Sequence, residues 1–129
     1  MQVRPLVYAD YVLLCSWWLS WGWSPPAVNM LPSTGYIVEV EGNPVLAGFL
    51  YQTDSALGWV EWVIANPAFR LERRQALPVL LEAIAKEATR RGIQALFTSS
   101  NHPGLIEGYK ANGFAVTDQG VTQLIRRLS

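Results

Sequence analysis

The chain has 129 residues, of which half are apolar and 12% are aromatic, and its formal net charge at pH 7 is zero. This length and composition predict one globular domain over residues 1–129 and exclude an intrinsically disordered protein. A single cysteine, Cys15, excludes an intrachain disulfide framework and is compatible with a reducing cytoplasm.

The longest apolar run, residues 11–23, indicates neither a membrane span nor a signal peptide. It is too short to cross a bilayer, and Ser16, Ser20 and Gly22 interrupt it. Only Arg4 supplies positive charge ahead of the run, and no clear small-residue cleavage site follows it. We therefore expect a cytoplasmic protein that does not enter a membrane.

Charge is distributed unevenly along the chain. Residues 1–69 carry one basic and five acidic side chains, whereas residues 70–129 carry nine basic and five acidic ones. The first part could favour a cation and the second a polyanion, although an ordinary mixed surface is equally compatible. Zero net charge and the acidic first half argue against a nucleic-acid-binding face.

The N-terminal region predicts a short strand followed by a tryptophan-rich helix. Pro5 restricts residues 2–6 to an edge strand or an early strand position. Residues 8–23 predict a helix with Asp10 as a cap near its start. Its tryptophans lie on more than one face, so they could pack in the core or form an aromatic wall for an acceptor or a partner protein. These residues are Trp17, Trp18, Trp21 and Trp23.

Residues 36–41, 45–52 and 57–65 are rich in strand-forming residues and are separated by turn signals. They predict an antiparallel meander of three strands. Regular alternation along the third strand would place its odd-numbered residues on one face and its even-numbered residues on the other. The two faces would be Trp59, Glu61, Val63 and Ala65 on one side, and Val60, Trp62 and Ile64 on the other.

Residues 66–75 predict an arginine-rich turn, which contains Arg70, Arg73 and Arg74. A long helix follows, with Pro78 in its first turn and Gly92 at its end. Apolar residues recur in it at helical spacing and predict one buried stripe. The stripe comprises Leu77, Leu80, Leu81, Ile84 and Ala88.

Residues 93–98 predict a short buried strand parallel to residues 57–65, because a helical crossover connects them. A short helix is expected over residues 105–112, and a final hairpin over residues 114–126. The fold class is therefore α/β, with a mixed sheet of about six to seven strands. His102 is the only histidine, and no Cys or His lies at metal-ligand spacing from it. We therefore expect His102 to be a surface turn residue and not part of a metal site.

This order of elements resembles the GNAT family of acyl-CoA N-acyltransferases over nearly the whole chain. The most specific part is an asparagine, a short helix carrying a tyrosine, and a Gly-Phe pair, which are Asn101, Tyr109 and Gly113-Phe114. Pro67, shortly after the third meander strand, is similarly placed. The resemblance implies a single GNAT-like domain with an N-terminal meander, a βαβ cofactor unit and a C-terminal hairpin.

The resemblance also implies acetyl-CoA as a cosubstrate. Its pantetheine arm would lie where the third meander strand splays from residues 93–98, and amides at the start of the long helix would hold its pyrophosphate. The cofactor-binding positions would then be Val63, Ile64, Ala65, Arg70, Arg73, Arg74, Gln75, Ala76 and Asn101.

Two residues match the catalytic positions that the resemblance implies. Glu61 would act as the general base, directly or through water, and its apolar strand neighbours would raise its pKa toward neutrality. Tyr109 would protonate the departing thiolate. Each also has a simpler interpretation, since Glu61 could be a solvent-facing or arginine-paired carboxylate and Tyr109 a packing residue.

The phosphate-binding loop departs from the family pattern. Where the family has Gln or Arg, then Gly, then Gly or Ala, this sequence has Glu72, Gln75 and Leu77. Glycines allow the backbone to approach phosphate closely. The three arginines of the turn could bind phosphate through their guanidinium groups instead, or the loop could fail to bind the cofactor.

The sequence therefore predicts an N-acetyltransferase that acts on a primary amine of a small molecule or peptide, and the acidic N-terminal half favours a cationic acceptor. The alternative is a GNAT-fold binding or scaffold module without catalytic activity, which would use its tryptophan-rich surface. The tryptophans and the final hairpin could also pair two chains into a homodimer.

Overall fold

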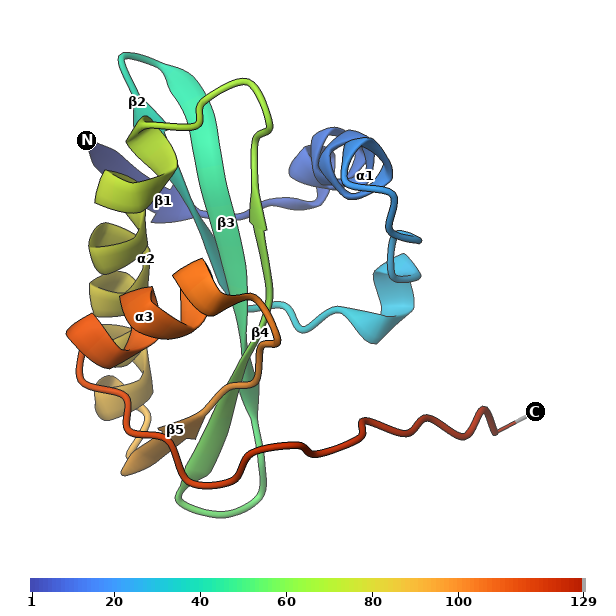
Figure 1. The fold of residues 1–129 in the computed structure, drawn as a ribbon, viewed down its shortest axis with the longest axis vertical. Helices are drawn as coiled ribbons and strands as arrows, with labels where there is room; N and C mark the ends of the chain where they lie inside the picture. Colours follow the sequence, from blue (N-terminus) through green and yellow to red (C-terminus); the bar gives the residue numbers. More distant parts are fainter. Residues whose placement is uncertain (129) are drawn as a thin grey trace.

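The computed structural model describes residues 1–128 as one α+β domain (Figure 1). The strands are β1 (Gln2–Pro5), β2 (Gly35–Val40), β3 (Asn43–Gln52), β4 (Leu57–Ala65) and β5 (Ala95–Phe97). The helices are α1 (Tyr11–Ser20), α2 (Glu72–Arg90) and α3 (Pro103–Ala111), with 3₁₀ turns η1 (Tyr8–Asp10) and η2 (Val28–Met30).

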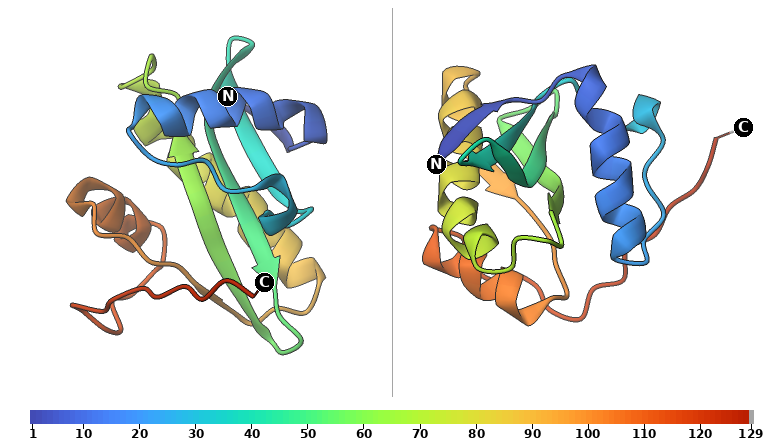
Figure 2. Two further views of the ribbon diagram at one scale, coloured as in Figure 1. Left: turned by 90° about the vertical axis from the view of Figure 1, so that its right-hand side faces the viewer. Right: turned by 90° about the horizontal axis from the view of Figure 1, so that it is seen from above.

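Within residues 1–128 the strands form one sheet in the order β1-β2-β3-β4-β5. The first four strands are antiparallel to their neighbours, and β4 pairs in parallel with β5. The predicted edge strand, meander and parallel βαβ unit are all confirmed. Helix α2 covers one face of the sheet and α1 covers the other, so the sheet is the middle of three layers (Figure 2).

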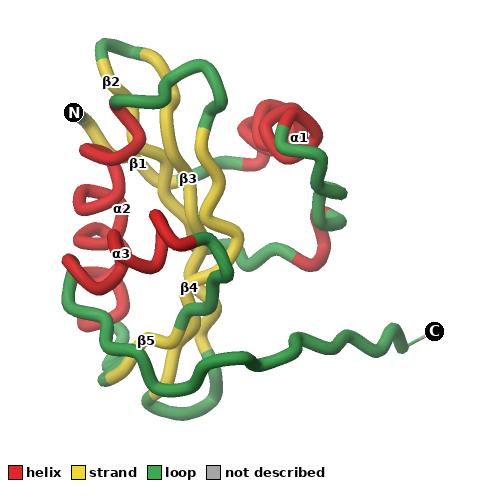
Figure 3. Tube along the Cα trace, in the orientation of Figure 1, coloured by secondary structure: helices red, strands yellow, loops and turns green. Residues whose placement is uncertain are grey.

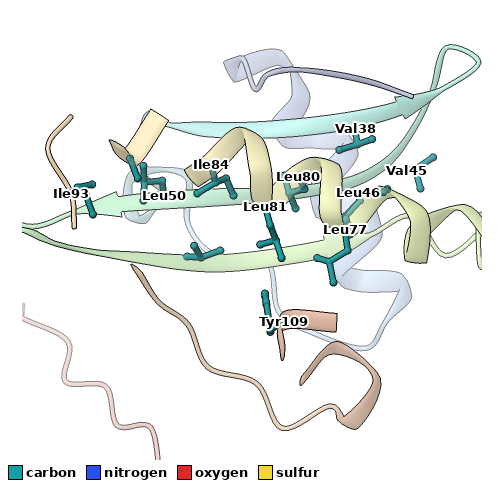
Figure 4. Packing of buried hydrophobic residues seen from close by; sticks show 13 residues of the cluster. Val38, Val45, Leu46, Leu50, Leu77, Leu80, Leu81, Ile84, Ile93 and Tyr109 are labelled. Atoms are coloured by element: carbon teal, nitrogen blue, oxygen red, sulfur yellow. The ribbon is translucent and has the colours of Figure 1, made fainter. Parts of the chain in front are cut away.

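The face of the sheet under α2 holds the larger core, and this core is mainly aliphatic (Figure 4). The predicted α2 stripe is confirmed, because all five of its residues are buried. Leu80 and Ile84 are completely inaccessible and contact the centre of the sheet. Burying side chains of this size stabilises the fold by roughly 1.5–3 kcal/mol each.

The face under α1 holds a smaller cluster. Leu14, Trp17 and Trp18 of α1 are buried against the sheet, and Phe49 and Ile64 are among the strand residues that they meet. Trp21 and Trp23 remain partly exposed, so the tryptophans do occupy more than one side of this region. Although α1 is very apolar, no helix among residues 1–128 is long and apolar enough to cross a membrane.

Asp10 occupies the N-cap position of α1, as predicted, but its side chain makes no capping hydrogen bond to this helix. Its carboxylate accepts a hydrogen bond from the backbone N–H of Val7 at 2.8 Å and pairs with the guanidinium of Arg4 at 2.9 Å. The hydrogen bond from Arg4 lowers the pKa of Asp10. Asp10 therefore fixes the η1 turn through Val7 and connects this turn to β1 through its ion pair with Arg4.

Helix α2 begins earlier than predicted, at Glu72, so Pro78 is its seventh residue and lies in its second turn. Proline has no N–H and leaves the carbonyl of Arg74 without its usual helical partner. Both Pro78 and Arg74 lie on the exposed side, where water can satisfy that carbonyl. The buried stripe on the opposite side stabilises the helix through this position.

The predicted C-terminal hairpin is wrong, and with it the count of six to seven strands. Residues 115–128 contain no helix or strand and leave the body of the domain as an extended tail (Figure 3). Val121, Leu124 and Ile125 are more than two-thirds exposed. Strand propensity produces a strand only where a pairing edge and a packing surface are available. Strand β5 is likewise short, and it is only partly buried.

Candidate active site

A β-bulge in β4 determines where its side chains point. Phe49 pairs with Glu61 and Ala47 pairs with Ile64, so Gly48 alone faces two residues of β4. One of them, Trp62, has a φ of 58°, in the left-handed region that non-glycine residues rarely adopt. A Cβ atom on Gly48 would lie 3.1 Å from Leu80 and 3.2 Å from Val63, so a larger residue would require these side chains to shift behind the bulge.

The bulge reverses the alternation of β4, and the predicted division of its faces is therefore wrong. Val60 lies before the bulge and Val63 and Ala65 lie after it, yet all three pack on the α2 side. Trp62 and Ile64 pack on the α1 side. Glu61 is also on the α1 side, because its antiparallel partner Phe49 packs there.

Glu61 is half-buried near the middle of the α1 face of the sheet. The indole N–H of Trp59 donates a hydrogen bond to its Oε2 at 3.0 Å. Burial raises the pKa of Glu61, and hydrogen bonds from Trp59 and the backbone N–H of Trp62 partly oppose this shift. The carboxylate is thus oriented by a neighbour and is more basic than an exposed glutamate.

Aromatic side chains surround Glu61 along β4. Trp59 stacks on Phe97 of β5, with ring centroids 5.4 Å apart. The indole N–H of Trp62 donates to the hydroxyl of Tyr51 at 2.8 Å, and this hydroxyl donates to the carbonyl of Met30 at 2.6 Å. These contacts fix an aromatic surface around the carboxylate and connect it to the η2 turn.

Tyr109 lies on α3, and its ring is buried in the core on the α2 side, opposite the face that carries Glu61 (Figure 4). The ring packs against Phe114, with centroids 5.3 Å apart. Burial raises the pKa of Tyr109, the hydroxyl of Thr98 lowers it, and the charge of Glu61 raises it. Thr98 is the common neighbour of the two candidate residues, because its hydroxyl also bonds to the carbonyl of Val60, the residue before Glu61.

Strands β4 and β5 separate close to these two residues. They pair only where Leu57–Trp59 faces Ala95–Phe97, and Thr98 makes a last contact by donating from its hydroxyl to the carbonyl of Val60 at 2.9 Å. Beyond this point β4 continues alone while the chain turns into α3 (Figure 1). The second half of β4 therefore has no strand neighbour on the β5 side.

Backbone groups at the end of β4 face this unpaired side. Asn66 donates its N–H to the carbonyl of Val45 at 2.8 Å, which identifies it as a hydrogen-bonded residue of the antiparallel ladder. Residues of such a ladder alternate, so the N–H and C=O of Ala65, which lies beyond the bulge, point away from β3. We call this unpaired side of β4 at Ala65 the free edge of β4.

The predicted cofactor residues lie around the free edge and the start of α2. Ile64 is buried in the α1-side core. Arg70, Arg74 and Gln75 are exposed, Arg73 is half-buried, and Ala76 is completely buried. Helix α2 begins at Glu72, so the backbone N–H groups of its first three residues have no partner within the helix. Gln75 and Ala76 come after these three residues, and their N–H groups lie in the hydrogen-bonded part of the helix.

Asn101 is exposed just before α3.

No protein-family model matches the sequence, and no curated protein is significantly similar to it. Solved structures do match. An acetyltransferase assigned to the GNAT family from Novosphingobium aromaticivorans DSM 12444 is 18% identical, with a TM-score of 0.68 over 89% of this chain and 52% of its own. The chain has the GNAT fold.

Two other solved structures match this GNAT fold over nearly their full length. The aminoglycoside acetyltransferase meta-AAC0020 from an uncultured soil metagenomic sample, in complex with sisomicin, is 15% identical. Its TM-score is 0.71, over 99% of this chain and 96% of its own. The aminoglycoside N-acetyltransferase AAC(6')-Iy in complex with CoA is also 15% identical, with a TM-score of 0.68 over 98% of this chain and 100% of its own.

The sequence did not predict that Trp21 contacts the end of β4 and the start of α2 in this GNAT fold. Its indole N–H donates to the carbonyl of Ala65 at 2.9 Å. The guanidinium of Arg73 lies 5.3 Å from the centre of the Trp21 ring, and Trp23 stacks on the ring at 6.1 Å. The sequence shows that tryptophans cluster here, but no local pattern signals a contact across 44 positions.

His102 also has a local role that the sequence did not specify. It is the N-cap of α3, and its Nδ1 accepts a hydrogen bond from the backbone N–H of Leu105 at 3.2 Å. This contact satisfies an amide at the start of the helix that carries Tyr109. His102 thereby helps to fix the position at which α3 begins in this GNAT fold.

Proposed function

We propose that this chain is an N-acetyltransferase that transfers an acetyl group from acetyl-CoA to a primary amine. The observation that carries the proposal is that Glu61 and Tyr109 lie on either side of the place where β4 separates from β5. Glu61 directly follows Val60, whose carbonyl accepts the last hydrogen bond from Thr98, and the hydroxyl of Tyr109 also interacts with Thr98. A basic carboxylate and a phenol beside an unpaired strand edge supply the two proton-transfer groups that aminolysis of a thioester requires. The similar structures are acetyltransferases, which supports the same reaction class.

The residues present fit the chemistry of the cofactor. The free edge of β4 offers backbone donors and acceptors of the kind that an extended arm containing amides can pair with. Arg70 and Arg74 offer exposed guanidinium groups to phosphates, and the side chains of Gln75 and Asn101 are also accessible nearby. When bound, acetyl-CoA supplies a thioester carbonyl that is open to attack by an amine.

Glu61 would accept the proton that the amine loses, directly or through a water molecule. Trp59 holds Oε2 of the carboxylate, so Oε1 is the oxygen available to the substrate. Burial raises the pKa of Glu61, which makes it a stronger base than an exposed glutamate. The aromatic surface around it would exclude water and contact the acceptor.

Tyr109 would protonate the leaving sulfur. Its raised pKa keeps the phenol protonated at neutral pH, as a general acid must be. In the complete reaction a C–N bond forms and the C–S bond breaks. One proton goes from the amine to Glu61 and another goes from Tyr109 to the thiolate, so no covalent intermediate with the enzyme is required.

The acceptor would approach from the α1 face of the sheet, where Glu61 lies. The acidic surplus of residues 1–69 favours a cationic amine, as predicted from the sequence. Two of the similar proteins are aminoglycoside acetyltransferases, and one of them binds sisomicin. We therefore propose small polyamines as the first acceptor class to examine.

Isothermal titration of the full chain with acetyl-CoA tests the cofactor half of this proposal, with a thermal-shift series as a second readout. Saturating ligand should raise the free energy of unfolding by about 2.7 kcal/mol at a concentration one hundred times the Kd. A matched titration with ATP shows how much of the response comes from phosphate alone. The absence of heat and of a thermal shift up to millimolar acetyl-CoA would favour the binding-module alternative.

A further inference from the structure

We propose that Trp21 is an intramolecular gate on the free edge of β4, and that the cofactor must displace its indole to bind. This inference rests on the proposed function, since the gate has meaning only if a ligand with amide groups uses that edge. Trp21 already occupies two groups that such a ligand needs. One is the carbonyl of Ala65 and the other is the guanidinium of Arg73.

The hydrogen bond from Trp21 to Ala65 would compete with a ligand for the same carbonyl oxygen. The carbonyl of Ala65 points away from β3, toward the side where β4 has no strand neighbour. A ligand pairing with the free edge would donate an N–H to this oxygen, and the indole N–H of Trp21 donates to it now. The indole therefore substitutes for a ligand amide and shields the edge from water or from another strand.

The contact with Arg73 couples the gate to the phosphate side. A guanidinium over an indole ring is held by a cation–π interaction, which contributes roughly 0.5–1 kcal/mol at an exposed site. When the indole leaves Ala65, this contact is also lost and Arg73 becomes available to a phosphate. One side-chain movement would thus expose both an acceptor for the arm and a cation for the phosphates.

The position of Trp21 allows this movement without unfolding the helix. Trp21 is the C-cap of α1 and immediately precedes Gly22, whose φ is 80°, so it lies at a turn at the end of the helix. Its side chain is 38% exposed, whereas Trp17 and Trp18 are 3% exposed and hold α1 against the sheet. The indole can rotate toward solvent while those two residues retain the core packing.

Calorimetric titration of CoA into wild type, Trp21→Ala and Trp21→Phe tests the gate. Trp21→Ala removes both contacts and should lower the Kd for CoA about tenfold, because binding no longer breaks them. Trp21→Phe keeps a ring for Arg73 but lacks the N–H donor, so its effect should be smaller, about threefold. Trp23→Ala is the matched control, since the side chain of Trp23 makes no hydrogen bond to the residues of β4, and its loss should change the Kd less than twofold.

A spectroscopic readout accompanies the titration. The indole N–H resonance of Trp21, assigned by its absence in Trp21→Phe, should shift when CoA is added because its bond to Ala65 breaks. If CoA binds wild type but binds Trp21→Ala equally or more weakly, the gate is wrong while the proposed function stands. If no form of the protein binds CoA, both the gate and the proposed function are wrong.

Discussion

The two faces of the sheet are built from different kinds of side chain. Under α2 the core is aliphatic, and residues such as Leu80, Ile84 and Val60 are completely buried. Under α1 the packing mixes aliphatic residues with tryptophans and Phe49. The side chains of Trp59, Trp62 and Tyr51 on this side each carry a hydrogen bond. The first face packs mainly through aliphatic contacts, whereas the second combines packing with several polar groups held in fixed orientations.

This difference indicates that one face of the sheet mainly stabilises the fold and that the other also orients polar side chains. Aliphatic burial is non-directional and contributes mainly to stability. Aromatic residues with a polar end can pack and still orient a hydrogen-bonding partner, as Trp59 orients Glu61. The bulge in β4 connects the two faces, because it turns Val63 to the α2 side and leaves Glu61 and Trp62 together on the α1 side.

Glu61→Gln should have the largest effect on the α1 face. Removing a positioned general base lowers turnover by roughly 10²–10⁴-fold. The Kd for acetyl-CoA should change little, since the carboxylate is assigned to the amine. Steady-state kinetics with a saturating amine measures the loss, and Glu82→Gln, an exposed carboxylate on α2, is the matched control. Equal turnover in wild type and Glu61→Gln would remove Glu61 from the mechanism.

Leu80→Ala should have the largest effect on the α2 face. The side chain is completely buried, so its truncation should lower the free energy of unfolding by about 2–5 kcal/mol. Chemical denaturation measures this change. Val12→Ala, on the exposed side of α1, should cost less than about 0.5 kcal/mol and serves as the control. A small loss in Leu80→Ala would contradict the assignment of stability to this face.

Tyr109 is assigned both a packing role in the core and a catalytic role as general acid, and Tyr109→Phe tests the two roles separately. The substitution keeps the buried ring and removes only the hydroxyl, so stability should change by about 1 kcal/mol or less. Turnover should fall by roughly 10²-fold if the hydroxyl protonates the leaving thiolate. A drop in stability with unchanged turnover would instead make Tyr109 a packing residue only.

The ionisation of Glu61 should make both the free energy of unfolding and turnover depend on pH, with smaller effects of definite sign. Its pKa is raised in the folded state, so the native protein binds more protons than the unfolded chain between the two pKa values. Stability therefore falls as pH rises through this window, and Glu61→Gln should be more stable than wild type at neutral pH. Turnover should rise over the same window as the base ionises. Denaturation and kinetics at matched pH values check both signs.

The smallest effect on folding is expected at the tail. At protein concentrations low enough to keep the chain monomeric, truncation after Gly120 should change the free energy of unfolding by less than about 0.5 kcal/mol, since the side chains of residues 121–128 are exposed. We propose that the same apolar residues pair two copies of the chain. Sedimentation velocity should then show a concentration-dependent dimer for the full chain and a monomer for the deletion variant. A monomeric full chain would contradict the pairing.

Local sequence patterns predicted the α2 face well and the α1 face poorly. The apolar spacing of α2 identifies its buried stripe because helical periodicity is regular over 19 residues. The bulge at Trp62 depends on tight packing around Gly48 and has no periodic signal, so the predicted faces of β4 were wrong after that point. The hydrogen bond from Trp21 to Ala65 depends on the tertiary fold, and the tail lacks the pairing edge that its propensities assumed.

Acetyl transfer itself tests the central claim most directly. The measurement is release of free thiol from acetyl-CoA in the presence of a panel of polyamines and aminoglycosides, with mass spectrometry of the products, for wild type and Glu61→Gln. The proposed mechanism predicts amine-dependent thiol release with one acetyl group added per thiol, and a loss of at least about 10²-fold in Glu61→Gln. Binding of acetyl-CoA without any amine-dependent thiol release across the panel would contradict it.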